Sequence, residues 1–132
     1  MTSVPATTSQ ALPEIVAVIE AYIAALNKRD LDGVRAAFHF PHVLFGSRMV
    51  THYPTPADLS FTAFDARTAQ HGWARSTWDG HCVLLSGLDK VHIDVWFTRW
   101  RADDSKIGTH HSMYILTRID GRWGIQARSS YG

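Results

Sequence analysis

Apolar residues recur at three- and four-residue steps near the start of the chain, which is the spacing of one face of a helix. They are Ile15, Val18, Ile19, Tyr22, Ile23 and Leu26. Pro13 suits the first turn of a helix, because its missing N–H would have no helical partner there. The pattern predicts a helix from Pro13 to about Lys28. Residues 1–12 lack such a pattern, so we expect a disordered lead-in followed by a single domain over residues 13–132.

Shorter elements are expected up to residue 72. Asp30 is placed to cap a second helix, whose inner residues would be Leu31, Val34, Ala37 and Phe38. The segments 42–45 and 49–53 flank a glycine-containing turn and predict a short hairpin. Thr55 and Pro56 have the form of a helix start, and Gly72 of a helix end. The inner face of this third helix would carry Leu59, Ala63, Phe64 and Ala66.

From Trp73 onward the pattern changes to the period of two that is typical of strands. One face of the strand that starts near residue 91 is apolar and carries Val91, Ile93, Val95 and Phe97. Asp120-Gly121 predicts a tight hairpin turn before the last strand. Helices followed by a run of strands predict an α+β fold. A strongly twisted sheet of this kind would curl around its helices and leave a cavity between them.

Charge and composition exclude some classes of protein. The 132 residues carry thirteen basic and twelve acidic side chains, for a net charge of +1, and so provide no broad basic field for nucleic acid. No apolar run approaches the length of a membrane span, and residues 1–12 lack the features of a signal peptide. The single Cys82 cannot form an internal disulfide, and we expect it to be buried. These observations favour a soluble cytoplasmic protein with no membrane partner.

Two segments carry a resemblance to a known family. They are EAYIAALNKRDLDGVRAAF, over residues 20–38, and YILTRIDGRWGIQARSS, over residues 114–130. With the order of the elements between them, the chain resembles the NTF2-like superfamily, in particular its SnoaL-like and small-polyketide-cyclase-like members, over about residues 12–131. The resemblance implies a cone-shaped α+β barrel with a pocket in its open end and frequent dimerisation through the sheet. Members include isomerases, dehydratases, cyclases, transport factors and domains without chemistry, so the resemblance predicts an architecture rather than a reaction.

Tyr22 matches the tyrosine that serves as oxyanion donor in the ketosteroid isomerase branch of this superfamily. The position of that branch's catalytic base falls on Gly46, and the late strand around residues 114–116 has no acid. Isomerase chemistry of that kind is therefore not expected. Tyr22 is still a catalytic candidate as a hydrogen-bond donor, and the alternative is a core residue whose hydroxyl reaches water.

The dehydratase branch of the superfamily uses two histidines as acid–base groups. His92 shares a strand face with Asp94, and we expect that face to be exposed or to contact a partner. His110 and His111 are adjacent, so they point to opposite sides of the sheet. Because His110 has the parity of Tyr114, it is the preferred acid–base candidate, although the pattern leaves open which of the three histidines is functional.

Arg99 and Arg128 lie on predicted strands beside apolar residues. The planar guanidinium of an arginine in an apolar cavity is suited to hold a carboxylate or enolate. The alternatives are a surface position or an ion pair with Asp30, Asp65 or Asp94. The residues that we expect to bind a ligand are Tyr53, Val95, Phe97, Tyr114 and Arg128.

The sequence thus predicts a domain that binds a small apolar organic molecule, with cofactor-free isomerisation, dehydration or cyclisation as its candidate chemistry. The alternative is a non-catalytic module for dimerisation or partner docking. No metal or other cofactor is expected, because Pro41 keeps His39 and His42 off a common helical face. Trp96 and Trp100 would lie on the outer sheet face, where a homodimer would form.

Overall fold

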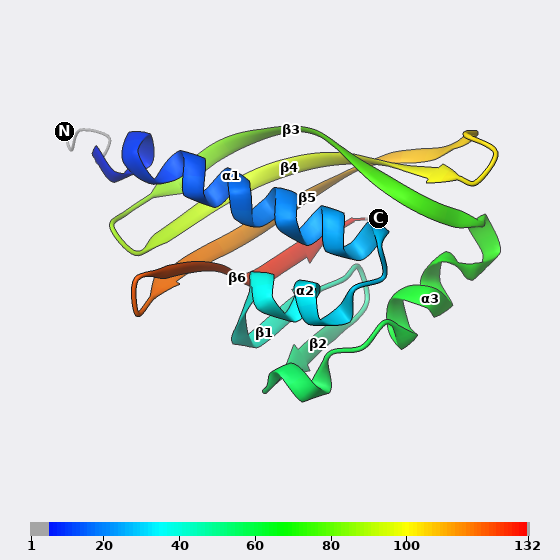
Figure 1. Ribbon diagram of the computed structural model, residues 1–132, viewed down its shortest axis with the longest axis horizontal. Coiled ribbons are helices and arrows are strands. Elements are labelled where there is room, and N and C mark those ends of the chain that lie inside the picture. The colour runs from blue at the N-terminus through cyan, green and yellow to red at the C-terminus, as the bar shows by residue number, and fades with distance from the viewer. Residues whose placement is uncertain (1–5, 132) are drawn as a thin grey trace.

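The computed structural model describes residues 6–131 as one curved, open sheet with helices packed against it (Figure 1). The strand order is β2-β1-β6-β5-β4-β3, so β2 and β3 form the edges. Strands β1 and β6 are parallel and the other neighbours antiparallel, which confirms the expected α+β fold. The strands are β1 Phe38–Phe45, β2 Val50–Tyr53, β3 Trp73–Ser86, β4 Lys90–Arg101, β5 Lys106–Ile119 and β6 Arg122–Ser130.

The first helix, α1, covers Ala6–Asn27 and contacts β3 and β6. It begins earlier than the predicted start at Pro13, so residues 6–12 of the expected lead-in are helical, and residues 1–5 lie outside the described part. Pro13 lies inside this helix and cannot donate a backbone hydrogen bond. The packing of Ala11, which is only 6% exposed, helps to offset that loss. Neither this helix nor any other in residues 6–131 is long and apolar enough to cross a membrane.

The second helix, α2, spans Leu31–Ala37 and follows its sequence signal closely. The Asp30 carboxylate accepts a hydrogen bond from the Gly33 backbone N–H at 3.0 Å, as an N-cap does. The helix ends before Pro41, because strand β1 already starts at Phe38. Pro41 therefore lies inside β1, after a cis peptide bond, and does not itself end the helix.

The expected third helix is interrupted. Thr55 and Asp58 form a capping box, and the Thr55 N–H donates to the Asp58 carboxylate at 2.9 Å. The box starts only the short 3-10 helix η1, Pro56–Asp58, after which the chain turns extended at Leu59. The helix α3 begins anew at Thr62 and ends at Thr68.

The interruption changes which residues of α3 face inward. Phe64 packs against the core, whereas Ala63 and Ala66 are exposed, which corrects the expected inner face. That face assumed one unbroken helix from residue 55, and the extended segment resets its phase. A second 3-10 turn, η2, Ala69–His71, leads to Gly72, whose φ of 71° ends the helix as predicted.

The two faces of the long strands differ as the period of two predicts. On β4, the side chains of Val91, Ile93 and Val95 are at most 1% exposed, and they form the inner face. Cys82 is exposed, contrary to expectation, because it lies on the edge strand β3 opposite Asp94 of the outer face. The turn at residues 120–121 has positive φ angles at both positions, as the Asp-Gly pair predicts.

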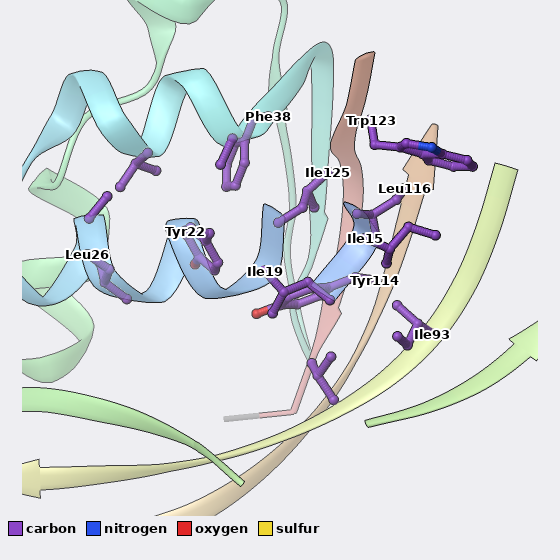
Figure 2. Packing of buried hydrophobic residues seen from close by; sticks show 14 of the residues in the cluster. Ile15, Ile19, Tyr22, Leu26, Phe38, Ile93, Tyr114, Leu116, Trp123 and Ile125 are labelled. Carbon is purple, nitrogen blue, oxygen red and sulfur yellow. The ribbon is translucent and has the colours of Figure 1, made fainter. Parts of the chain in front are cut away.

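The core lies between α1 and the inner sheet face (Figure 2). At one end it is aliphatic and fully buried, with Ile15 and Ile19 of α1 against residues of β4, β5 and β6. One turn further along the same helix, Tyr22 contacts the rings of Phe38 at 5.2 Å and Tyr114 at 6.1 Å. The interior therefore becomes aromatic and carries hydroxyl groups toward the C-terminal end of α1.

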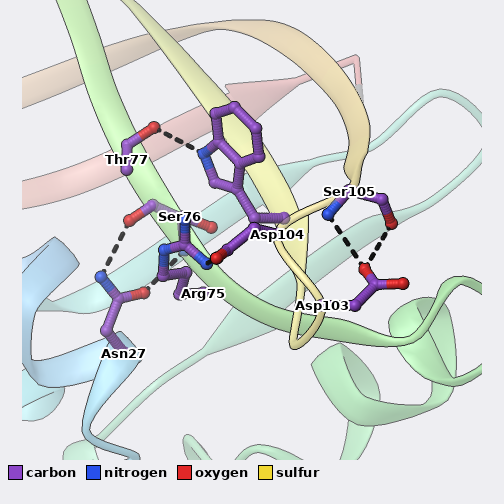
Figure 3. A network of polar contacts seen from close by, with 8 residues as sticks. Asn27, Arg75, Ser76, Thr77, Asp103, Asp104 and Ser105 are labelled. Carbon is purple, nitrogen blue, oxygen red and sulfur yellow. Dashed lines mark hydrogen bonds and ion pairs between the residues drawn. The ribbon is translucent and has the colours of Figure 1, made fainter.

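The end of α1 is fixed to β3 by a pair of hydrogen bonds (Figure 3). The Asn27 side-chain amide donates to the Ser76 carbonyl, and its oxygen accepts from the Ser76 N–H, both at 2.8 Å. This bidentate contact satisfies backbone groups of β3 at the point where the helix ends, and so holds the helix and the strand at a defined separation.

Candidate functional site

A cavity of about 350 Å³ lies between the C-terminal half of α1, α3, the β1–β2 loop and the inner face of β4, β5 and β6. Its apolar lining includes Ile23, Leu26, Leu44, Met49, Phe64 and Phe97, and its cationic lining includes Arg48, Arg67, Arg99 and Arg128. This size and mixture suit a small organic molecule. A second cavity of about 30 Å³ adjoins it beneath α2 and shares Tyr22, Arg67 and Arg128.

Arg128 is held in place by two side chains from other elements. Its Nη1 donates to the Tyr22 hydroxyl at 3.0 Å, and its Nε donates to His42 Nε2 at 2.9 Å. His42 Nδ1 lies 3.0 Å from the Ile125 carbonyl and therefore acts as the donor there. The guanidinium also lies 4.8 Å from the centre of the Phe38 ring. These contacts orient the guanidinium within the cavity wall.

His42 orients Arg128 without neutralising it. Burial, and then the charge of Arg128, lower the pKa of His42 to about 3, although the hydrogen bond that His42 donates to the Ile125 carbonyl acts in the opposite direction. The imidazole is therefore neutral near pH 7 and accepts the Arg128 N–H through Nε2. It stacks on Phe38 with ring centres 4.1 Å apart. Arg128 therefore keeps its full positive charge, which is available to a ligand in the cavity.

A β-bulge in β6 explains how Arg128 reaches the cavity. Trp123 and Ile125 face the core, and strict alternation would turn residue 128 outward. The pairing of β5 with β6 passes from Ile115 opposite Ala127 to Leu116 opposite Ile125, so Gln126 has no partner. The extra residue reverses the alternation, and residue 128 enters on the inner face.

Arg99 and Arg67 approach the cavity from β4 and α3. Burial lowers the pKa of both, and the second cause is a neighbouring cation, Arg67 for Arg99 and Arg128 for Arg67. Their guanidinium groups lie 5.7 and 5.8 Å from the centre of the Phe64 ring. Arg99 Nε is buried without a hydrogen-bond partner. Arg67 lines the cavity and is also exposed to solvent.

None of these three arginines forms an ion pair within residues 6–131. The carboxylates considered as alternatives are engaged elsewhere. Asp30 caps α2, Asp65 pairs with Arg29 at 2.7 Å, and Asp94 pairs with His111 at 3.0 Å. The lining of the cavity contains no Asp or Glu among the described residues. The cavity is therefore strongly cationic and has no counter-charge of its own.

Hydroxyl groups complete the polar lining. Tyr114 is 4% exposed, and burial, followed by the neighbouring Tyr22, raises the pKa of its phenol. Tyr114 is therefore protonated at neutral pH and suited to donate a hydrogen bond. Ser76 and Ser112 line the same cavity and are buried. The cavity therefore presents hydroxyl groups and guanidinium groups to an acceptor.

The structure brings four of the predicted site residues together. Tyr22, Phe97, Tyr114 and Arg128 line the larger cavity. Tyr53 lines only the smaller one, and Val95 packs in the core and lines neither. The functional roles of these residues remain predictions, and their positions decide which of them can touch a ligand in the larger cavity.

His110, the candidate acid–base group, lines neither cavity. It packs against Phe97 with ring centres 5.5 Å apart, and its Nε2 is buried without a partner. Burial, and then Arg99, lower the pKa of His110. His110 has the inner parity of Tyr114 but lies four residues further toward the start of β5, beyond the cavity lining.

The other two histidine candidates lie on the outer face. His111 pairs with Asp94 and stacks on Trp96 at 4.6 Å, so Asp94 contacts His111 rather than His92. Residues 6–131 contain no group of three or more His, Cys, Asp or Glu side chains that could hold a metal ion.

Two residues of the site were not among the candidates from the sequence. His42 has the same strand parity as Leu44 and so could have been assigned to the inner face. Arg67 lies three residues after Phe64, which the sequence already placed on the inner face of this helix, so the helical spacing could have found it.

The chain belongs to the family described as NTF2-like protein (DUF6841), whose model matches residues 13–131. No curated protein matches it. Among solved structures, a protein of unknown function with a cystatin-like fold from Nostoc punctiforme has a TM-score of 0.75 at 17% identity, over 98% of this chain and 94% of that one. It is one of several structures that share the fold.

Two other similar structures show how differently this fold is described. A candidate ketosteroid isomerase from Shewanella frigidimarina has a TM-score of 0.65 at 18% identity, over 86% of this chain and 91% of that one. A candidate calcium/calmodulin dependent protein kinase II association domain from Xanthomonas campestris has a TM-score of 0.65 at 17% identity, over 90% and 85%. At such identities the likeness defines the fold alone.

Proposed function

We propose that this domain binds a small, mostly apolar organic molecule that carries an acidic group. The observation that supports this function is a largely apolar cavity with four arginines and, among the described residues, no carboxylate to balance them. Buried positive charges are costly unless they are paired. A ligand carboxylate would supply the missing partner, and the oriented pair of Arg128 and Tyr22 is suited to receive it.

Binding is better supported than proton abstraction. The described lining of the cavity has no Asp, Glu or His that could act as a general base. Tyr22 and Arg128 could still stabilise an enolate oxygen in a cofactor-free isomerisation, dehydration or cyclisation of SnoaL-like type, with Tyr114 as a further donor. His110 could take part only after a rearrangement that brings its ring to the cavity.

The outer sheet face supports the proposal of a homodimer. Trp96, Met113 and Ile115 are partly exposed on adjacent positions of β4 and β5, and aromatic and Met side chains are enriched at protein interfaces. A non-catalytic docking module would use the same face. A cytoplasmic location is part of the proposal, and the one exposed thiol, Cys82, suits a reducing compartment.

Binding can be tested by thermal unfolding and calorimetry with aromatic carboxylates and their neutral amides. The acids should raise Tm and the amides should not, because only the acids offer a charge to the arginines. Arg128→Met should abolish the shift while the protein stays folded. Arg118→Met is the matched control, since Arg118 pairs with Asp89 on the surface.

The same experiment defines failure. If acids and amides shift Tm equally, or if Arg128→Met and Arg118→Met respond alike, the cavity does not select an anion and the proposal is wrong.

A further inference from the structure

We propose that the ligand carries two separate acidic groups, one held by Arg128 and Tyr22 and the other by Arg99, with Arg67 near both. This inference rests on the proposed function and names the class of ligand: a compact organic diacid with an apolar body. It follows from where the three cations lie and from the charge that a single acid would leave unbalanced.

The first step is the separation of Arg99 and Arg128 along the sheet. Arg99 pairs with Gly108 of β5, and Arg128 pairs with Tyr114 of the same strand. These two partners are six residues apart on β5, which corresponds to about 20 Å along a straight strand. The two arginines therefore start from distant parts of the sheet and extend into one cavity. Arg128 donates from Nε to His42 and from Nη1 to Tyr22, which fixes its guanidinium at one end of the cavity.

The second step concerns Arg67, which lies near both of the other cations. It shares the Phe64 ring with Arg99, and it lines both cavities together with Arg128. Burial, and then Arg128, lower the pKa of Arg67, and burial, and then Arg67, lower that of Arg99. Arg67 can therefore contribute its charge to either acidic group.

The third step is the balance of charge. Of the four arginines that line the cavity, Arg48 and Arg67 are exposed to solvent, whereas Arg99 and Arg128 are half-buried. A single carboxylate would leave one of the two half-buried cations unpaired, and two carboxylates would pair both. Arg99 Nε, buried without a partner, would then gain an acceptor. A diacid therefore both reduces the repulsion between the arginines and supplies the missing acceptor for Arg99 Nε.

The lining between the two ends fits an apolar body. Phe97 is 8% exposed and lies on β4 two residues before Arg99, so it shares the inner face. Phe64 lies beneath the guanidinium groups of Arg67 and Arg99. With Leu26 of α1 they form an apolar surface between the acid-binding ends. A ring or short apolar chain would pack there.

Calorimetry with a matched series tests the proposal: benzoate, isophthalate, terephthalate, naphthalene dicarboxylate, phenyl phosphate and the neutral diamides. At least one dicarboxylate should bind about tenfold or more tightly than benzoate. The dicarboxylate that binds most tightly should be the same one at every salt concentration. Arg99→Met should bring that dicarboxylate to the affinity of benzoate and leave benzoate itself within about twofold. Arg118→Met should change neither, and the Tm of each variant shows that it is folded.

Three results would overturn the inference. Equal affinity of benzoate and every dicarboxylate would leave the proposed function standing and refute the second acidic group. Phenyl phosphate that binds as tightly as the best dicarboxylate would show that one doubly charged group suffices. If neither mono- nor diacids bind, the inference fails together with the proposed function.

Discussion

The two ends of the interior are built from the same elements and have opposite character. At one end, Ile19 of α1 meets Ile93, Leu116 and Ile125, which are fully buried and fill the space between helix and sheet. At the other end, the same helix and the same strands surround a cavity with four arginines. The aliphatic end is stabilised by its own packing, whereas the cationic end contains charges that nothing in the described chain neutralises.

The difference shows where the fold is stabilised and where it is available for a ligand. Close-packed aliphatic side chains contribute to stability in proportion to the area they bury. Uncompensated cations oppose folding, and a domain keeps them only when another requirement outweighs their cost. We therefore expect substitutions at the aliphatic end to reduce stability, and substitutions at the cationic end to change binding with little loss of stability.

The largest effect is expected from Ile19→Ala. Ile19 is 0% exposed, so truncation leaves a cavity in a region that cannot collapse, at a cost of about 3–5 kcal/mol. Leu26→Ala is the matched variant on α1, and it should cost about 1–2 kcal/mol because Leu26 already borders open space. Chemical denaturation measures both. Equal losses at the two positions would show that the cavity wall is as tightly packed as the core.

A second prediction uses pH at the boundary between the two ends. His42 has a folded-state pKa of about 3, below its ordinary value of 6.5. The unfolded chain therefore binds the proton first as pH falls. The stability associated with neutral His42 is present above about pH 6.5 and is lost toward pH 3, by up to about 1.4 kcal/mol per unit.

Substitution separates the contribution of His42 from that of other groups. His42→Gln should reduce the slope of stability against pH between pH 6.5 and 4.5, whereas His52→Gln, at an exposed position of β2, should leave the slope unchanged. The free energy of urea unfolding at a series of pH values is the measurement. An unaltered slope in His42→Gln would mean that the imidazole is charged in the folded protein.

A third, smaller effect concerns the contact that holds the cavity open at the end of α1. Asn27→Ala leaves the N–H and carbonyl of the buried Ser76 without their partners, at a cost of about 1–3 kcal/mol. Because Ser76 lines the cavity, ligand affinity should fall as well. Thr77→Ala, which removes exposed hydrogen bonds to Trp100 and Asp79, is the control. Lost stability with unchanged affinity would separate this contact from the site.

The sequence predicts the fold well because periodicity and end signals are local. The stripe from Ile15 to Leu26, the cap at Asp30 and the turn at Asp120-Gly121 all act through neighbours in sequence, and the structure contains each of them. The site is harder to predict from the sequence, because it depends on irregularities in the pairing of strands. Gln126, which has no partner in the pairing of β5 with β6, reverses the direction of Arg128.

The same reasoning explains what the sequence did not predict for the histidines. Strand parity correctly places His110 on the inner face but does not say how far the cavity extends along β5, because its ends depend on side chains from α3 and from the β1–β2 loop. His42 was not a candidate because its role is to orient Arg128, and such a contact between distant parts of the chain leaves no pattern in the sequence.

The smallest expected effect most directly tests the comparison between the aliphatic end and the cationic end of the interior. Arg99→Met keeps much of the side-chain volume and removes a charge that is repelled by Arg67 and whose buried Nε has no partner. It also removes contacts with the Phe64 and Phe97 rings, so the net gain for the free protein should be modest, up to about 1 kcal/mol. A Tm about 1–4 °C higher would report it.

Arg118→Met should lower Tm slightly or leave it unchanged, because Arg118 has Asp89 as a partner. If Arg99→Met instead destabilises the free protein by more than the loss of two ring contacts can explain, then Arg99 is a structural residue. The cationic end would in that case contribute to stability as the aliphatic end does.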